Sequence, residues 1–271
     1  ALTGWTREQS PARAIAIDGK EVRGAKNGAG SRVFLMAAVD HDTASVIGQE
    51  AIGEKTNEIP HFPVLLDQLG DLTGTVITAD ALHTQREHAE TLHARGAHYV
   101  FTVKANQPSL RDRIASQTWA SLPAQHVQHE KAHGRTTTWA ITTQPAQTWI
   151  GFPHATQTIR LTRDRMHHRT GETTREQIYA ITSLTPAQAS PENLAALIRG
   201  HWVIENRLHW VRDVTYDEDR SQIRTANGPR IMATIRNLAI SIHRLTGATN
   251  IAKATRTAMR NPEHARQLTG L

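Results

Sequence analysis

The order of short apolar segments along the first 120 residues restricts the fold of this chain more than any other feature. Three apolar segments come first and are close enough in sequence to form an antiparallel meander: residues 14–18, 33–39 and 44–48. Amphipathic and apolar segments then alternate as helix, strand, helix, strand and helix: residues 57–69, 75–80, 85–95, 98–103 and 109–119. This order predicts a mixed α/β fold, a mixed sheet covered by helices.

The pattern changes near residue 121. Thr-rich alternating segments at 136–143, 158–162 and 177–182 predict a β-rich insertion over 121–188. Beyond it the pattern is helical, with two helices predicted at 229–245 and 251–260. Before them, one apolar seam at helical spacing is expected from Leu194, Leu197, Ile198, Ile204, Leu208 and Val211. The predicted organisation is a linker or remnant at 1–13, a core at 14–120, the insertion at 121–188 and a helical completion at 189–271.

The composition excludes several classes of protein. The chain has no Cys, so it cannot be a disulfide scaffold, hold a Cys-ligated zinc ion or use a thiol nucleophile. No apolar stretch approaches the roughly 20 residues of a membrane span, and no signal peptide is present, so we expect an intracellular soluble protein without membrane contact.

The net charge is +6, but its distribution is uneven. Residues 1–100 contain 9 Lys and Arg against 13 Asp and Glu, and the remainder contains 22 against 12. The 25 Arg against 6 Lys fit phosphate recognition, although a genome rich in G·C codons gives the same bias. Nucleic acid is therefore a plausible partner.

Two aspartates stand at the ends of predicted strands. Asp18 follows residues 14–17 and Asp80 follows residues 75–79. A carboxylate at such a position often caps a turn or helix. Two of them on one predicted sheet can instead share a hard divalent cation such as Mg²⁺.

The densest segment of candidate residues is 201–210. On an α-helix, His201, Glu205, His209 and Arg212 share one face beside the apolar seam. This arrangement is typical of either a buried ion pair or a metal ligand among phosphate-binding groups. The two histidines are eight residues apart, which disfavours a zinc site. The acidic residues that follow include Asp213, and those at 217–219 are expected in a solvated loop or cap.

Several of these segments occur together in one known family. The chain contains, in order, A-I-D-G-K at 16–20, K-T-N-E-I at 55–59, A-D-A at 79–81, K-A-N-Q at 104–107 and H-G-R at 133–135. They are followed by H-W-x-I-E-N-x-L-H-W at 201–210 and D-V-T-Y-D-E-D at 213–219. In these motifs the chain resembles the bacterial insertion-sequence DDE transposases of the H-repeat-associated (ISAs-type) group, over about residues 14–245.

The resemblance implies a ribonuclease H-like catalytic core with an Asp–Asp–Glu triad. By position, the triad is Asp18, Asp80 and Glu205, with spacings of 62 and 125 residues and a β-rich insertion in the second gap. It also implies Mg²⁺ or Mn²⁺ as cofactor, with two ions, and double-stranded DNA as partner. A homodimer on the DNA and a cytoplasmic, nucleoid-associated location are expected.

Basic and polar residues of the same motifs are expected to bind DNA. Arg212 lies where a related Tyr-Arg-Glu-Lys signature has a basic residue, seven positions after Glu205, whereas His201 and Ile198 replace the Arg and Tyr. The predicted DNA-binding residues are Lys20, Arg23, Lys104, Asn106, Gln107, His133, Arg135, His201, Arg207, His209 and Arg212.

Three functions are consistent with these features. The leading hypothesis is a transposase that cleaves DNA at the element ends and joins them to target DNA. The second is a remnant that only binds DNA, and the third is a metal-dependent nuclease that cuts without joining. Family members carry a further N-terminal helical segment, so we expect this chain to be a fragment or a truncated copy.

Overall fold

The computed structural model describes residues 12–25, 33–52 and 58–269. The chain divides into two compact units, which are described separately. The first unit comprises Ala1–Thr75 with Gly200–Leu271, and the second comprises Val76–Arg199. No helix in the described ranges combines the length and the apolar character that a membrane span requires.

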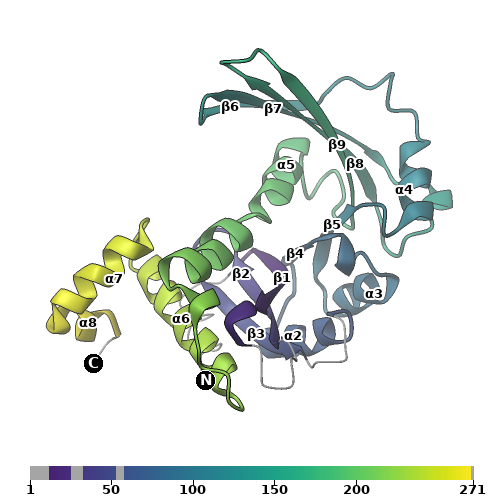
Figure 1. Cartoon of the computed structure of the whole chain (residues 1–271). Helices are drawn as coiled ribbons and strands as arrows, with labels where there is room; N and C mark the ends of the chain where they lie inside the picture. The colour runs from purple at the N-terminus through teal and green to yellow at the C-terminus, as the bar shows by residue number, and fades with distance from the viewer. Residues whose placement is uncertain (1–11, 26–32, 53–57, 270–271) are drawn as a thin grey trace. The chain divides into compact units, whose positions relative to one another are not determined.

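The first unit contains a three-stranded antiparallel sheet in the order β3-β2-β1, with helices packed against it (Figure 1). Its elements are β1 (Ala14–Val22), the 3-10 turn η1 (Arg23–Ala25), β2 (Val33–Asp40), β3 (Val46–Ile52), α2 (His61–Leu69), the π-helical segments η4 (Ile204–His209) and η5 (Val211–Thr215), the 3-10 turn η6 (Glu218–Arg220), α6 (Gly228–Leu245), α7 (Ile251–Arg260) and α8 (Pro262–Thr269). The predicted meander is therefore present, and the predicted helices at 229–245 and 251–260 match α6 and α7. Helix α8 has no counterpart in the prediction.

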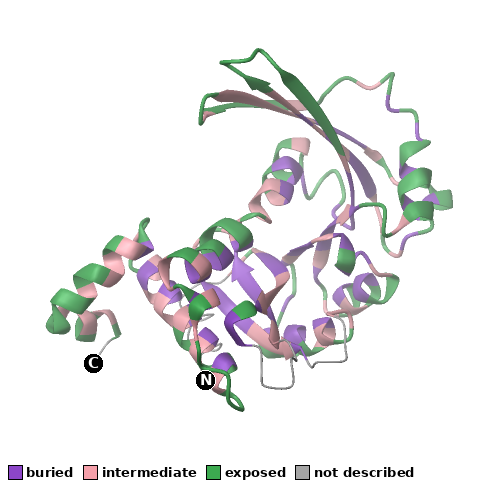
Figure 2. Ribbon diagram, viewed as in Figure 1, coloured by how far each residue is buried: buried purple, intermediate pink, exposed green. Residues whose placement is uncertain are grey.

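Two helices cover opposite faces of β3. A Cβ at Gly48 would lie 2.7 Å from a side-chain atom of Leu69 in α2, so this helix packs directly on the strand. The next residue, Gln49, is hydrogen-bonded to Thr234 and Asn237 of α6. Because successive side chains of a strand point to opposite faces, α2 and α6 lie on different sides of the sheet. This cover explains why the middle of β2 is fully buried (Figure 2).

The second unit contains a mixed sheet in the order β4-β5-β9-β8-β7-β6. β4 and β5 are parallel, and the other pairs are antiparallel. The elements are β4 (Val76–Ala79), the 3-10 turn η2 (Ala81–His83), α3 (Arg86–Ala94), β5 (His98–Val103), α4 (Pro108–Ala115), β6 (His126–Ala132), β7 (Arg135–Pro145), the 3-10 turn η3 (Thr148–Ile150), β8 (Gln157–His167), β9 (Thr173–Thr182) and α5 (Pro191–Gly200). Strand β6 has no counterpart in the prediction, because most residues of this strand are polar and exposed.

The predicted β-rich insertion is continuous with the sheet of β4 and β5. Four residues of β9 pair with β5, so the sheet runs on across the predicted boundary at residue 120. The compact units are bounded at 75/76 and 199/200 instead. The organisation of the chain in four segments stays a prediction. Strand β8 is exposed at its C-terminal end, and β9 is exposed at its N-terminal end (Figure 2).

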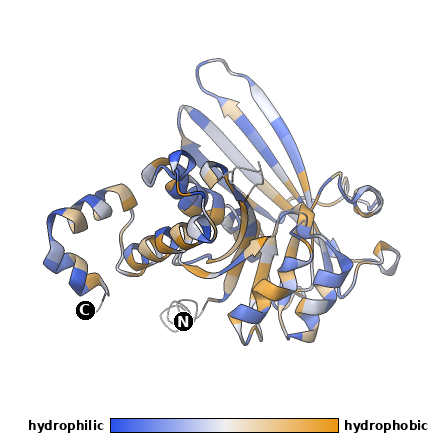
Figure 3. Cartoon of the chain, turned by 60° about the horizontal axis from the view of Figure 1, so that its bottom comes forward, coloured by the Kyte–Doolittle hydropathy of each residue, from blue (hydrophilic) through white to orange (hydrophobic). Residues whose placement is uncertain are grey.

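The predicted apolar seam after residue 191 belongs to two different cores. Leu194 and Ile198 of α5 pack with β-strand residues of the second unit, and Leu197 packs against the same cluster. Ile204 and Leu208, by contrast, pack with Ala16 of β1 in the first unit. The helix ends at Gly200, where His41 lies so close that a Cβ would overlap its ring. The prediction of one apolar seam from Leu194 to Val211 was therefore wrong. Apolar residues recur along α6 (Figure 3); Ala233 and Ile240 among them are buried, whereas Ile231 and Ile235 are exposed.

Candidate metal centre

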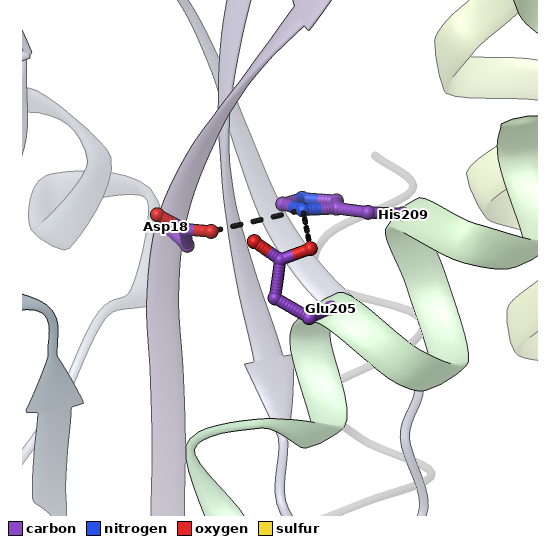
Figure 4. Close-up of side chains that lie close together, drawn as sticks. All are labelled: Asp18, Glu205 and His209. Carbon is purple, nitrogen blue, oxygen red and sulfur yellow. Dashed lines mark ion pairs between the residues drawn. The ribbon is translucent and has the colours of Figure 1, made fainter. Parts of the chain in front are cut away.

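Asp18, Glu205 and His209 come together in the first unit (Figure 4). His209 Nδ1 lies 3.4 Å from Glu205 Oε2 and 3.7 Å from Asp18 Oδ2. One possible ligand atom from each side chain lies within 4.8 Å of the other two. The cluster joins strand β1 to the π-helical segment η4. Sequence reasoning paired Asp18 with Glu205 but placed His209 only among DNA-binding residues, although its position four residues after Glu205 indicated the contact.

The position of Asp18 within β1 explains this contact. The strand continues to Val22, so Asp18 is paired with Ala37 of β2 in mid-strand and is not at a strand end as predicted. The alternation of side chains places Ala16, Asp18 and Lys20 on one face. Ala16 packs in the core with Ile204 and Leu208, and Asp18 meets Glu205 and His209. Each step of two residues along β1 therefore contacts a successive part of the helix.

Lys20 completes this series. Its Nζ lies 2.7 and 2.8 Å from the two carboxylate oxygens of Asp213, and only 9% of its side chain is exposed. Lys20 therefore has an internal partner, which differs from the phosphate contact predicted for it. The ion pair holds β1 against η5 at a position two residues after Asp18.

The helix that carries Glu205 is not a regular α-helix. Its backbone is π-helical over η4 and η5, and the N–H of Tyr216 donates to the carbonyl of Val211, five residues earlier. π-Helical segments are uncommon and frequently occur at functional sites. Because the helix winds differently, Glu205 and Arg212 do not share one face as α-helical spacing predicted. The Glu205 side chain is 60% exposed, whereas that of Arg212 is fully buried.

The charges of the cluster are adjusted by its surroundings. Burial holds the pKa of His209 below its ordinary value, against the opposing effect of Glu205. The hydrogen bond from His209 lowers the pKa of Glu205, and Lys20 contributes to the same shift. At neutral pH a neutral His209 thus donates from Nδ1 toward an ionised carboxylate. Its Nε2 is buried and has no hydrogen-bond partner in the described part of the chain.

Asp80 lies in the second unit, directly after β4. Its Oδ1 accepts a hydrogen bond of 2.8 Å from the N–H of Leu82, so it caps the turn η2. Asn106 and Gln107 hold the same turn, because their side-chain amides donate to the carbonyls of Ala81 and Thr84. The K-A-N-Q motif thus has a role within the chain, next to the A-D-A motif. The predicted DNA contacts of Asn106 and Gln107 remain a prediction.

Arg212 is part of a buried charge cluster. Its guanidinium lies 2.7 Å from Glu218 Oε2, and Arg236 lies 3.1 Å from the other oxygen of the same carboxylate. Neither Arg212 nor Glu218 is exposed. A buried guanidinium cannot contact a DNA phosphate, so the structure corrects the role predicted for Arg212. It also corrects the expectation for Glu218, which lies in the core and not in solvent, whereas Asp217 is exposed.

The other predicted DNA-binding residues are distributed over both units. Arg207, Lys104 and His133 are exposed, as is Arg23, which lies 3.7 Å from Asp219. Arg135 and His201 are half-buried. His133 and Gly134 form the two-residue turn between β6 and β7, with positive φ angles of 50° and 69° that are typical of tight hairpins.

The K-T-N-E-I motif is only partly described. Residues 55–57 lie outside the described residues, but the Glu58 carboxylate lies against Gly19. A Cβ at position 19 would overlap that carboxylate, so the glycine next to Asp18 permits this close approach of the Glu58 side chain. Two motifs that are far apart in sequence therefore meet at β1.

The donor set fits a hard divalent cation. Asp18 and Glu205 supply carboxylate oxygens, which Mg²⁺ and Mn²⁺ prefer, and the half-exposed Glu205 leaves the cluster open to solvent on one side. His209 offers either an imidazole ligand or a hydrogen bond that orients the two carboxylates.

Comparisons with known proteins agree on one family. The family model described as "Transposase DDE domain" matches residues 9–242. The chain is 31% identical over 244 residues to "Putative protein YbfL" of Escherichia coli (strain K12), covering 84% of this chain and 63% of that protein. It has the same identity and coverage with "H repeat-associated putative transposase YhhI" of the same strain. The chain therefore spans 63% of the length of these relatives.

Among solved structures, the chain is similar to a chain of the piggyBac transposase synaptic complex with hairpin DNA. The TM-score is 0.46 at 12% identity, and the match covers 93% of this chain and 49% of that chain.

Proposed function

Because this chain belongs to the transposase DDE domain family, we propose that it is the catalytic part of an insertion-sequence transposase that cleaves and joins DNA. The observation that carries the proposal is the meeting of Asp18 with Glu205. The two carboxylates lie far apart in sequence and are brought together by β1 and η4. Asp80 is proposed as the third acidic residue of the triad.

The order of elements supports a ribonuclease H-like core. The antiparallel strands β1 to β3 precede the parallel pair of β4 and β5, with helices between and after them. We propose this fold for the chain.

Asp18, Glu205 and Asp80 would hold two Mg²⁺ or Mn²⁺ ions. When bound, such ions supply activation of an attacking oxygen and stabilisation of a leaving oxygen in displacement at phosphorus. The residues of this chain would position the reaction. His209 orients the Asp18 and Glu205 carboxylates, and the Lys20–Asp213 pair holds β1 against η5.

DNA is the proposed substrate. Its phosphates would be contacted by four exposed residues, Arg23, Lys104, His133 and Arg207, and by the half-buried Arg135 and His201. A homodimer on the DNA is proposed for the complete protein.

Cleavage of a plasmid tests the proposal. The plasmid carries the inverted repeats that flank the coding region, and the purified protein is incubated with it in Mg²⁺, Mn²⁺ or EDTA. We expect nicking at the repeat ends only with metal. Asp18→Asn, Asp80→Asn and Glu205→Gln should each abolish nicking, whereas the exposed control Glu192→Gln should retain it.

Two further outcomes decide between related activities. Joined products with a 3′-hydroxyl donor, absent with a 3′-deoxy donor, indicate a transposase and not a simple nuclease. Metal-dependent nicking that survives Glu205→Gln but fails in Asp219→Ala contradicts the assignment of Glu205.

A further inference from the structure

A cavity of about 410 Å³ lies in the first unit, between the π-helical segments, the end of α6 and the start of α7. From η4 and the residue after it, Asn206, Arg207 and Trp210 line this cavity. Glu205 and His209 of the same helix face Asp18 instead. One helix therefore presents the candidate metal centre on one side and this cavity on another.

The charge of the cavity is not balanced by an acid. Arg207 and Arg244 line it, and no Asp or Glu is among its lining residues. Arg207 has no ion pair in the described part of the chain. The Arg244 Nη1 donates to the carbonyls of Ala248 and Thr249 at 3.0 Å each, which holds the guanidinium in place. Two cations without an acidic partner provide a site for an anion, and Arg is well suited to phosphate.

Burial and the nearby Arg207 lower the pKa of Arg244, which shows that the two guanidinium groups act on each other. The Arg244 Nε is buried and has no hydrogen-bond partner among the described residues. A bound phosphate would relieve this repulsion. The first turn of α7, at Ile251 and Ala252, also lines the cavity, and the positive end of the helix dipole favours a negative charge there.

The same cavity has an aromatic wall. Trp210 is 56% exposed, an unusual state for a side chain with so large an apolar surface. A nucleobase can stack on such a surface irrespective of its identity. The wall therefore combines the two groups that recognise a nucleotide, a stacking surface and paired cations.

We infer that this cavity binds one nucleotide of a DNA strand, with its phosphate at Arg207 and Arg244 and its base against Trp210. The inference rests on the proposed function, because DNA is the partner it assigns. Arg207 was predicted to bind DNA from sequence. The cavity adds Trp210, Arg244 and the start of α7, and it assigns a stacked base to the contact.

Fluorescence anisotropy with labelled 30-nucleotide single strands and duplexes tests the inference. The titrations are done in EDTA, so that binding is measured without metal or cleavage. We expect Trp210→Ala to weaken single-strand binding about tenfold or more, as loss of base stacking does. Arg207→Gln should weaken it as well and reduce the salt slope by about 0.7.

Matched variants provide the controls. Trp149→Ala removes another tryptophan of similar exposure, 48%, and Arg220→Gln removes an arginine whose side chain is 85% exposed; neither residue lines the cavity. All variants should keep the wild-type midpoint of urea unfolding, because substitutions at exposed positions change stability little.

Three results would overturn the inference. Trp210→Ala and Arg207→Gln could bind DNA as tightly as their controls. Trp210→Ala could weaken the duplex but leave the single strand unchanged. A free deoxynucleoside monophosphate at equal nucleotide concentration could displace the strand, which would indicate a free nucleotide as ligand. Metal-dependent cleavage that persists alongside any of these results leaves the proposed function intact, so the two failures can be distinguished.

Discussion

Arg212 and Glu218 form an ion pair in which neither side chain is exposed, with 2.7 Å between Nη2 and Oε2. Arg236 lies 3.1 Å from the second oxygen of the same carboxylate. The three residues connect η5, η6 and α6. Backbone carbonyls of η6 and of Ser221 also lie against Gly24 of η1, close to the end of β1. The buried cluster therefore holds η5, η6 and α6 together beside η1.

Removing Glu218 should destabilise the protein strongly. Glu218→Ala leaves two guanidinium groups without their buried counter-charge, a change that costs about 3–5 kcal/mol. Urea denaturation measures the loss in the free energy of unfolding. The neighbouring Asp217→Asn is the control: it removes an exposed ion pair with Arg220, keeps a residue type that tolerates the left-handed backbone at this position (φ 48°), and should change stability by less than about 0.5 kcal/mol. Equal stability of the two variants would contradict the assigned role of Glu218.

Lys20 and Asp213 should be energetically coupled. Lys20→Met leaves the Asp213 carboxylate, which is 30% exposed, without its main cation, and we expect a loss of about 2 kcal/mol. A double-mutant cycle with Asp213→Asn measures the coupling, which should exceed about 1 kcal/mol. If the two losses simply add, the ion pair contributes nothing specific. A phosphate-binding role for Lys20 would instead appear as weaker DNA binding with unchanged stability.

His209 should contribute to metal affinity. We expect Asp18→Asn and Glu205→Gln to remove most Mn²⁺ binding, measured by calorimetry. His209→Ala should weaken it about 10- to 100-fold, because the two carboxylates lose the group that orients them. The exposed His167→Ala is the control. Unchanged Mn²⁺ affinity in His209→Ala would show that the histidine only fills space.

His41 should make stability depend on pH. Burial, reinforced by His201 and opposed by Asp40, lowers the pKa of His41 from 6.5 to about 4. Between these values the unfolded chain binds a proton that the folded chain does not. The free energy of unfolding should therefore fall as the pH decreases from 6.5 to 4, by up to about 3 kcal/mol. His41→Gln should flatten this part of the curve in urea denaturation at pH 7 and 4.5. A variant that keeps the wild-type slope would assign it to other groups.

Much of the secondary structure could be predicted from local sequence. The strand at 98–103 and the helix at 251–260 have the predicted bounds, and the five strands β1 to β5 occur in the predicted order. These elements bury an apolar face, and the period of that face is visible in the sequence. β6 and the π-helical winding have no such signal. The polar sequence of β6 resembles that of a loop. The π-helical segments contain the same types of residue as an α-helix, so their sequence does not distinguish the two.

The sequence by itself determined which residues are candidates and in which motifs they stand. Asp18, Asp80, Glu205 and His209 could all be selected from it, because a carboxylate or imidazole beside an apolar segment is conspicuous. Only the tertiary structure decided which of them meet and what surrounds them. The Lys20–Asp213 pair joins residues 193 positions apart, and Arg212 is buried where helical spacing predicted a phosphate contact. Such contacts depend on how β1 packs against a distant helix, and burial then decides whether a charge serves the core or a ligand.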